Sequence, residues 1–170
     1  MDNNVIDFPV SIVGVGGAGK NMINDLEQSS ILGSANFQLI DGFAPDILGT
    51  HWFSTSKSMI ICGGLGGKTG TQEIVNLTKA AKQAGKKVIA CIALPFLFEG
   101  ITRNNKANDA LQILQPLVDQ MIMMKNEELF LEFDQTQPIY NLFKERNKII
   151  TQHLESLFVK QVPMNDTIRG

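Results

Sequence analysis

The chain has 170 residues, of which 44% are hydrophobic and 19% are charged, so we expect residues 1–170 to form a single domain with a full core. Its formal net charge of −2 and its scattered Lys and Arg residues predict no nucleic-acid partner. No apolar run approaches the length of a membrane span and the N-terminus has no basic segment, so we expect a cytoplasmic protein without a membrane partner.

Hydrophobic periodicity predicts strands and helices that alternate along the chain. In chain order these are a strand at 9–15, a helix at 19–28, a strand at 37–41, a loop or short helix at 42–56, a strand at 57–62, a helix at 70–84, a strand at 87–93, a helix at 102–118 with Pro116 in its last turn, a strand at 120–124 and a helix at 138–160. Gly85 follows the second helix as a C-cap.

Each predicted helix has an apolar face. These faces comprise Met22, Ile23 and Leu26; Ile74, Leu77, Ala81 and Ala84; Ala110, Leu111, Leu114 and Leu117; and, in the last helix, Ile139, Leu142, Phe143, Ile149, Ile150, Leu154, Leu157 and Phe158. The strands are apolar on both sides. We therefore predict an α/β fold: a three-layer, Rossmann-like parallel sheet with helices on both faces and a long amphipathic C-terminal helix.

The cysteines and histidines do not suggest a metal site. Cys62 and Cys91 lie in or at the end of apolar runs, where a free cysteine behaves as a small buried hydrophobic residue. His51 and His153 have no cysteine or second histidine at ligand spacing. We expect structural cysteines and no transition metal.

Two glycine-rich turns are the main functional signal: GVGGAGKN at 14–21 and GGLGGKTGT at 63–71. Each follows a predicted strand and opens a predicted helix. Such turns aim backbone N–H groups at an anion, and the helix N-terminus adds partial positive charge. Since ligands of parallel sheets bind beyond the carboxyl ends of the strands, two such turns predict a ligand with several phosphates.

The first turn alone leaves other interpretations open. Gly14, Gly16 and Gly19 satisfy G-x-G-x-x-G, and Asp41 ends the next strand, which together favour a nicotinamide or flavin cofactor with its ribose on Asp41. The second turn approaches a P-loop, but Cys62 stands where that motif needs a glycine. A purely structural alternative is that the glycines only permit tight strand-to-helix turns.

Several motifs resemble the tubulin/FtsZ family, in the right order and over nearly the whole chain. GVGGAGKN resembles the family's first loop, GVGGGGGN, and GGKTGT at 66–71 resembles its GGGTGTG signature. ALPFLFEGITR at 93–103 looks like the FtsZ segment TKPFNFEGKKR. VDQMIMMKNEEL at 118–129 resembles VDSLITIPNDKL, and FKERNKII at 143–150 is similar to FGAANDVL.

The resemblance implies an FtsZ-like domain, linked to cell division or filament assembly, that binds GTP or GDP, with Mg²⁺ as a companion of the nucleotide. The residues that it implies for the phosphates are Gly16, Gly17, Ala18, Gly19, Lys20 and Asn21, and Gly66, Gly67, Lys68, Thr69, Gly70 and Thr71.

The resemblance also implies residues for the ribose and the base. Glu99 and Arg103 match positions that contact the ribose and the nucleotide. Because they are four residues apart on one helix turn, they would face one cleft. An exposed ion pair is the alternative for these two. Phe143 matches the family's aromatic ring that lies against guanine, and Asn147 matches the amide that reads the edge of the guanine base. Asn126 matches the asparagine of the PND motif.

Departures from the family pattern also carry predictions. Lys68 and Gln72 replace glycines of the signature, and we hypothesise that Lys68 supplies a cation to the phosphates. Lys148 replaces the aspartate after the guanine-reading asparagine. The family's NTD motif after the second strand is replaced by Asp41, Gly42 and Phe43. Between Asp41 and Lys57 the chain is shorter than the family's, which includes a loop that senses the γ-phosphate.

The segment VPMNDTIRG at 162–170 resembles the start of the FtsZ loop that inserts catalytic carboxylates into the next subunit's nucleotide. Asn165 matches that loop's asparagine, but Thr167 and Gly170 stand in place of its acids, and we expect a domain without the family's C-terminal domain. Because such hydrolysis needs a group that positions water, we expect no catalytic residue here and poor hydrolysis by the chain alone. The expected partner is a full-length FtsZ-type protein or a second copy.

Two alternatives remain at this point. One is an interaction module that kept the fold and lost the nucleotide, and the other is an NAD-binding Rossmann protein.

Overall fold

The computed structural model describes residues 6–42 and 46–161, which contain a five-stranded sheet with the strand order β2-β1-β3-β4-β5. All neighbouring strands are parallel. The strands are β1 (Val10–Val15), β2 (Asn36–Ile40), β3 (Ser58–Gly64), β4 (Lys87–Leu94) and β5 (Gln120–Lys125). The predicted α/β fold with a parallel sheet is confirmed.

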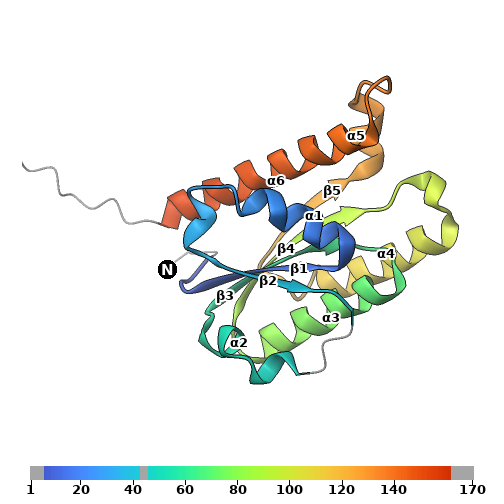
Figure 1. Ribbon diagram of the computed structural model, residues 1–170. Coiled ribbons are helices and arrows are strands. Elements are labelled where there is room, and N and C mark those ends of the chain that lie inside the picture. The colour runs from blue at the N-terminus through green and yellow to red at the C-terminus, as the bar shows by residue number, and fades with distance from the viewer. Residues whose placement is uncertain (1–5, 43–45, 162–170) are drawn as a thin grey trace, which may run out of the picture.

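Helices cover both faces of this sheet (Figure 1). On one face lie α1 (Gly16–Leu26) and α6 (Ile139–Gln161), and on the other lie α2 (His51–Thr55), α3 (Lys68–Gln83) and α4 (Ile101–Leu114). The short α5 (Asn126–Glu132) follows β5, and the 3₁₀ helices η1 (Leu32–Ser34), η2 (Ile47–Gly49) and η3 (Leu97–Glu99) lie in connections. The three layers and the long C-terminal helix match the expectation.

The central strands are buried on both sides because their residues alternate between two cores. In β3, Ile60 and Cys62 pack toward α1 and α6, whereas Met59 and Ile61 pack toward α3 and α4. Cys62 is the register partner of Cys91, and both are buried free thiols. A hydrogen bond with Cys62 and complete burial raise the pKa of the Cys91 thiol well above its usual value, so an inert packing role fits both.

The two halves of the sheet diverge between β1 and β3. From β1 the chain passes through α1 to β2 on one side, and from β3 it passes through α3 to β4 on the other. Val15 at the end of β1 is the register partner of Gly63 near the end of β3. This is the topological switch point at which open α/β sheets bind ligands, and both glycine-rich turns lie there.

Some local predictions were wrong. The helices α1 and α3 begin at Gly16 and Lys68, earlier than expected, because the glycine turns themselves form the first helical turns. Ala84 is exposed because α3 ends at Gln83, although Gly85, with φ +76°, follows it as predicted. Helix α4 ends at Leu114, before Pro116, whose ring opposes helix continuation.

Other residues of the predicted helix faces are less buried than expected. Leu111 and Leu117 are only half-buried, and Ile139 and Ile149 are exposed. The short helix allowed for in 42–56 is α2, whereas α5 was missed.

Candidate functional site

The N-termini of α1 and α3 meet at the switch point without caps from side chains. Val15 precedes α1 and Gly67 precedes α3, and neither of these N-cap residues provides a side-chain hydrogen bond to the helix. Neither helix has an acidic residue in its first turn. The free N–H groups and the positive ends of both helix dipoles are therefore available to an anion.

The positions in the two turns require glycine for different structural reasons. Gly16 and Gly66 have φ values of +67° and +109°, which side chains rarely adopt. A Cβ on Gly17 would meet no atom within 4 Å, so this backbone borders open space. A Cβ on Gly14 would lie 2.7 Å from the carbonyl oxygen of Gly19, and one on Gly19 would collide with the carbonyl oxygen of Cys62. Gly14 thus lets α1 pack closely on β1, and Gly19 lets it pack closely on β3.

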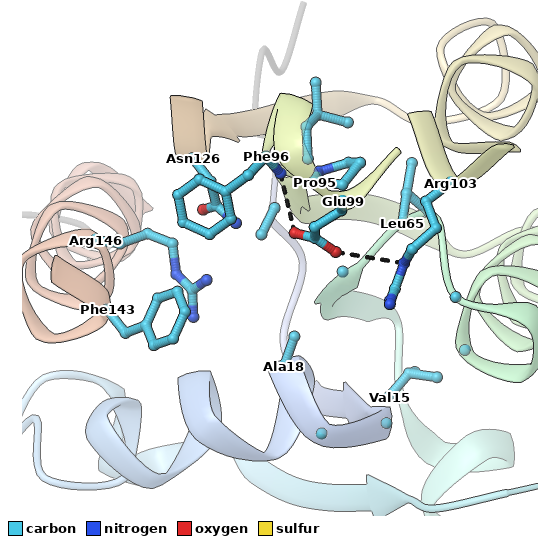
Figure 2. Close-up of a pocket in the computed structure, with 17 residues that line it drawn as sticks. Val15, Ala18, Leu65, Pro95, Phe96, Glu99, Arg103, Asn126, Phe143 and Arg146 are labelled. Atoms are coloured by element: carbon cyan, nitrogen blue, oxygen red, sulfur yellow. Dashed lines mark hydrogen bonds and ion pairs between the residues drawn. The ribbon is translucent and has the colours of Figure 1, made fainter. Parts of the chain in front are cut away.

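A cavity of about 310 Å³ opens at this edge and runs from the glycine turns toward α5 and α6 (Figure 2). Its lining combines backbone from the turns with side chains from β4, η3, α4, α5 and α6. The lining residues are Val15, Gly16, Gly17, Ala18, Gly64, Leu65, Gly67, Gly70, Ala93, Leu94, Pro95, Phe96, Glu99, Arg103, Asn126, Phe143 and Arg146. Residues from distant parts of the sequence therefore share one space.

A second cavity of about 330 Å³ adjoins the first on the β2 side and shares Val15, Gly16, Gly17, Gly67 and Gly70 with it. Its other lining residues are Asp41, Gly42, Lys68, Thr69 and Glu73. Lys68 and Thr69 are exposed at the N-terminus of α3, so both can reach an anion held between the turns.

Glu99 and Arg103 form an ion pair of 3.3 Å at the cavity wall. They do not share one helix turn, as the spacing had suggested, because Gly100, with φ +103°, separates η3 from α4. Glu99 also accepts a hydrogen bond of 3.0 Å from the Phe96 backbone N–H. A Cβ on Gly67 would lie 3.8 Å from Arg103 Nη2, which puts the guanidinium beside the second glycine turn.

Asn126 provides an independent indication that a ligand fits here. It is the first residue of α5, its side chain is buried, and it lines the cavity. Its Oδ1 atom has no hydrogen-bond partner among the described residues. Since an unpaired buried acceptor is costly, a ligand N–H or O–H group at this position would satisfy it.

Phenylalanine rings surround the end of the cavity near α5 and α6. Phe96 stacks on Phe98 at 4.8 Å between ring centres and contacts Phe130 and Phe143 at 5.9 and 6.4 Å. Phe143 is half-buried and lines the cavity, as its predicted position against a base requires.

Asn147 lies on the same helix but does not line either cavity. Its side chain is buried, and its Nδ2 donates to Asn21 Oδ1 at 2.9 Å and to Asp25 Oδ2 at 2.8 Å. The amide thus ties α6 to α1. Asp25 is partly buried, which raises its pKa, but hydrogen bonds from Lys144 and Asn147 and two nearby positive charges outweigh burial and lower the pKa from 3.8.

Five other predicted residues also stay outside the lining of the two cavities: Gly19, Lys20, Asn21, Gly66 and Thr71. Thr71 accepts a hydrogen bond of 2.9 Å from the Gly66 N–H at its Oγ1, so it stabilises the second turn from within. Lys20 is exposed on α1. The remaining members of the predicted set surround the two cavities.

Arg146 is a cavity residue that the sequence reasoning missed. Only 3% of it is exposed, and its guanidinium lies over the Phe143 ring at 4.8 Å from the ring centre. Burial lowers its pKa to about 10, which leaves it charged at neutral pH. The available signal was its position four residues from both Leu142 and Ile150, which places it on the buried face of α6.

Some earlier expectations fall on residues outside the described ranges, namely Phe43 and the segment with Asn165, Thr167 and Gly170. Within the described ranges, no helix has the length and hydropathy needed to span a membrane.

Comparisons with known proteins find similar sequences. A profile for the Tubulin/FtsZ family, GTPase domain, matches residues 50–133. The cell division protein FtsZ of Rickettsia conorii is 24% identical over 88% of this chain, and that of Rickettsia felis is 25% identical over the same share. The chain covers 41% of each of these two proteins.

Solved structures share the fold. An empty FtsZ dimer from M. jannaschii superposes with a TM-score of 0.67 at 24% identity, over 88% of this chain and 54% of that one. CetZ2 from Haloferax volcanii, solved as a GTPgS-bound protofilament, gives a TM-score of 0.71 at 16% identity, over 93% and 60% of the two chains. From these matches, the chain is similar to the tubulin/FtsZ family in sequence and shares its fold.

Proposed function

We propose that this chain is an FtsZ-like guanine-nucleotide-binding protein that holds GTP or GDP between its two glycine-rich turns and has no strong hydrolytic activity of its own. The observation that carries this proposal is the meeting of two uncapped helix N-termini, those of α1 and α3, at the switch point of the sheet. One such terminus attracts one phosphate, and two that face one cavity suit a di- or triphosphate.

The remainder of the site supports a nucleotide rather than inorganic polyphosphate. Phe143 and Phe96 provide apolar ring surface at the α6 end of the cavity, and the unpaired Asn126 Oδ1 provides an acceptor there. Glu99 and Arg103 lie at the cavity wall, with Arg103 beside the second glycine turn. Phosphates at the turns and a base beside Phe143 would use both ends of one cavity.

Residues for an accompanying Mg²⁺ would lie on the β2 side. Asp41 and Glu73 line the second cavity beside the glycine turns, and carboxylate oxygens are ligands that Mg²⁺ prefers. Lys68 is the cation nearest to this space on α3 and would neutralise phosphate charge there.

Weak hydrolysis is expected because Thr167 and Gly170 stand where the FtsZ loop carries acids. We expect slow GTP turnover by the chain alone. As an FtsZ-like protein it would act in cell division or filament assembly through a full-length FtsZ-type protein or a second copy, and turnover should be assayed with and without such a partner. Appreciable turnover by the chain alone would contradict the expectation that it holds no catalytic residue.

The NAD-type alternative keeps one specific observation in its favour. Asp41 follows β2 and lines the second cavity with Gly16 and Gly17, as a ribose-binding carboxylate of a dinucleotide site would. The larger aromatic surface lies at the opposite end, beside α6, which favours the guanine-nucleotide proposal.

Calorimetric and thermal-shift titrations with GTP, GDP, ATP and NAD, each with and without Mg²⁺, separate these functions. A ligand that binds only the native state raises the melting temperature with its concentration. The proposal predicts shifts with GTP and GDP that exceed those with ATP and NAD. NAD-selective binding would support the dinucleotide alternative, and no shift with any ligand would support an interaction module.

A matched pair of variants localises the binding. Gly17→Val puts a side chain into the open space beside the first turn, whereas Gly33→Val adds the same atoms at another open position outside both cavities. We expect Gly17→Val to lose nucleotide binding and Gly33→Val to retain it. Equal binding by both variants would place the ligand elsewhere.

A further inference from the structure

The guanidinium of Arg146 is a buried cation without a buried counter-ion. No carboxylate lies within ion-pair distance of it in the part of the chain that the structure describes. Asp25 attracts it electrostatically without a hydrogen bond or ion pair to it. The direct polar contacts of the guanidinium are with two asparagines. Burying a charge in this way is costly unless something binds it.

The hydrogen bonds of Arg146 use only part of its donor set. Nε and Nη2 both donate to Asn147 Oδ1 at 3.3 Å, and Nη2 donates to Asn21 Oδ1 at 3.2 Å. The two N–H groups of Nη1 therefore have no hydrogen-bond partner among the described residues. The asparagines fix the guanidinium and leave one side of it for another acceptor.

The position of the guanidinium directs this free side to the base end of the cavity. Arg146 lines the cavity, and Figure 2 shows its side chain reaching from α6 toward the space bounded by Phe143 and Phe96. The contact with the Phe143 ring, 4.8 Å from the ring centre, holds it at that wall. The glycine turns lie at the other end of the same cavity.

We propose that Arg146 is a specificity-determining residue that donates through Nη1 to the O6 and N7 acceptors of a guanine base. The inference rests on the proposed function, since it presupposes a nucleotide whose phosphates lie on the glycine turns. Guanine presents O6 and N7 side by side, and arginine is the side chain that most often binds this edge. Adenine carries an amino group in place of O6. This group donates hydrogen bonds and cannot accept one from Nη1, so the buried guanidinium would remain partly unpaired.

This arrangement makes the 2-amino group of guanine a minor contributor to selectivity. Lys148, next to Asn147, is exposed and provides no acceptor for that group. Inosine diphosphate retains O6 and N7 and lacks the amino group, whereas 7-deaza-GDP lacks the N7 acceptor. The two analogues therefore separate recognition through Arg146 from recognition of the opposite edge of the base.

The first test uses the unmodified chain and calorimetric titration with GDP, inosine diphosphate, 7-deaza-GDP and ADP. We expect inosine diphosphate to bind about as tightly as GDP, and 7-deaza-GDP and ADP to bind about tenfold more weakly or worse. Equal affinities for GDP and 7-deaza-GDP would overturn the role of Arg146. Failure of the chain to bind GDP at all would instead overturn the proposed function, and the inference with it.

The second test repeats the titrations with Arg146→Met, Arg146→Lys and the control Lys148→Met, each checked by thermal unfolding. Lys148 lies two residues away, carries the same charge and lines neither cavity. Arg146→Met should bind GDP about tenfold more weakly and should lose the penalty for 7-deaza-GDP. Arg146→Lys retains the charge, so it should recover part of the affinity, and Lys148→Met should behave like the parent.

The pattern of loss separates base recognition from a general charge effect. If Arg146→Met weakened GDP, 7-deaza-GDP and ADP by the same factor, Arg146 would act on the phosphates and the proposal would be wrong. If the variant fails to fold, the analogue series on the unmodified chain still decides the question.

Discussion

Val15 and Gly63 are register partners near the carboxyl ends of β1 and β3, and the chain leaves this pair in opposite directions. Helix α1 follows the first strand on one face of the sheet, and α3 follows the second strand on the other face. The two glycine-rich turns thus present their backbone N–H groups to one space from both faces. The proposed phosphate site is a consequence of this topology.

Gly19→Ala should destabilise the fold because the new Cβ would collide with the backbone oxygen of Cys62. That oxygen belongs to a central strand and cannot move aside cheaply, so we expect a loss of about 2 kcal/mol or more in the free energy of unfolding. Urea denaturation measures it. Gly33→Ala, where a Cβ meets nothing within 4 Å, is the control and should change stability little. Equal stability of both variants would contradict the close packing of α1 on β3.

Lys68→Ala should weaken GDP and GTP binding because it removes a cation from the cavity that adjoins the glycine turns. We expect a loss of about tenfold, the size of one exposed hydrogen bond to a charged group. Titration calorimetry provides the affinities. Lys79→Ala removes the same charge farther along α3, at a residue that lines neither of the two cavities described above, and should retain parental affinity. A Lys68→Ala protein that binds as tightly as the parent would exclude the cation hypothesis.

Arg103→Met should reduce affinity for GDP but not for guanosine. The guanidinium lies beside the second glycine turn, and its ion pair with Glu99 keeps it at the cavity wall. We expect the loss for GDP to be about tenfold, since the contact is charge-assisted but partly solvent-screened. Competition binding with both ligands measures the difference. A similar loss for guanosine would assign Arg103 to the nucleoside instead.

The stability of the fold should depend on the ionisation of Asp25. Its pKa is lowered from 3.8 in the folded state, so its contribution is complete above about pH 5 and is lost as the pH falls through the lowered value. Asp25→Asn should therefore flatten the decrease in unfolding free energy below about pH 4. Urea denaturation at a series of pH values tests this. Superimposable pH profiles for the parent and the variant would refute a stabilising role for the Asp25 charge.

Sequence patterns were sufficient for much of the fold and part of the site. Strand positions followed from apolar runs such as 57–62, because a parallel sheet buries both strand faces. The glycine turns, Glu99, Arg103 and Phe143 could be placed at one cavity because motif order and strand alternation bring them to one sheet edge.

Other features depended on packing that no local pattern specifies. Helix α5, with the sequence NEELFLE, is too short and too charged to give a helical period. Asn147 was expected at the base, but its hydrogen bonds to Asn21 and Asp25 depend on how α6 lies on α1. Arg146 interrupts an apolar helix face, and only the assembled cavity shows what this buried cation borders.

A crystal structure of the chain grown with GDP would test the central claim most directly. The proposal predicts density for the diphosphate between the N-termini of α1 and α3, with the base beside Phe143 and the Arg146 guanidinium at its O6 and N7 edge. Density with the base beside Asp41 would contradict this arrangement and favour a dinucleotide-type site. The absence of nucleotide from both cavities at saturating GDP would contradict nucleotide binding itself.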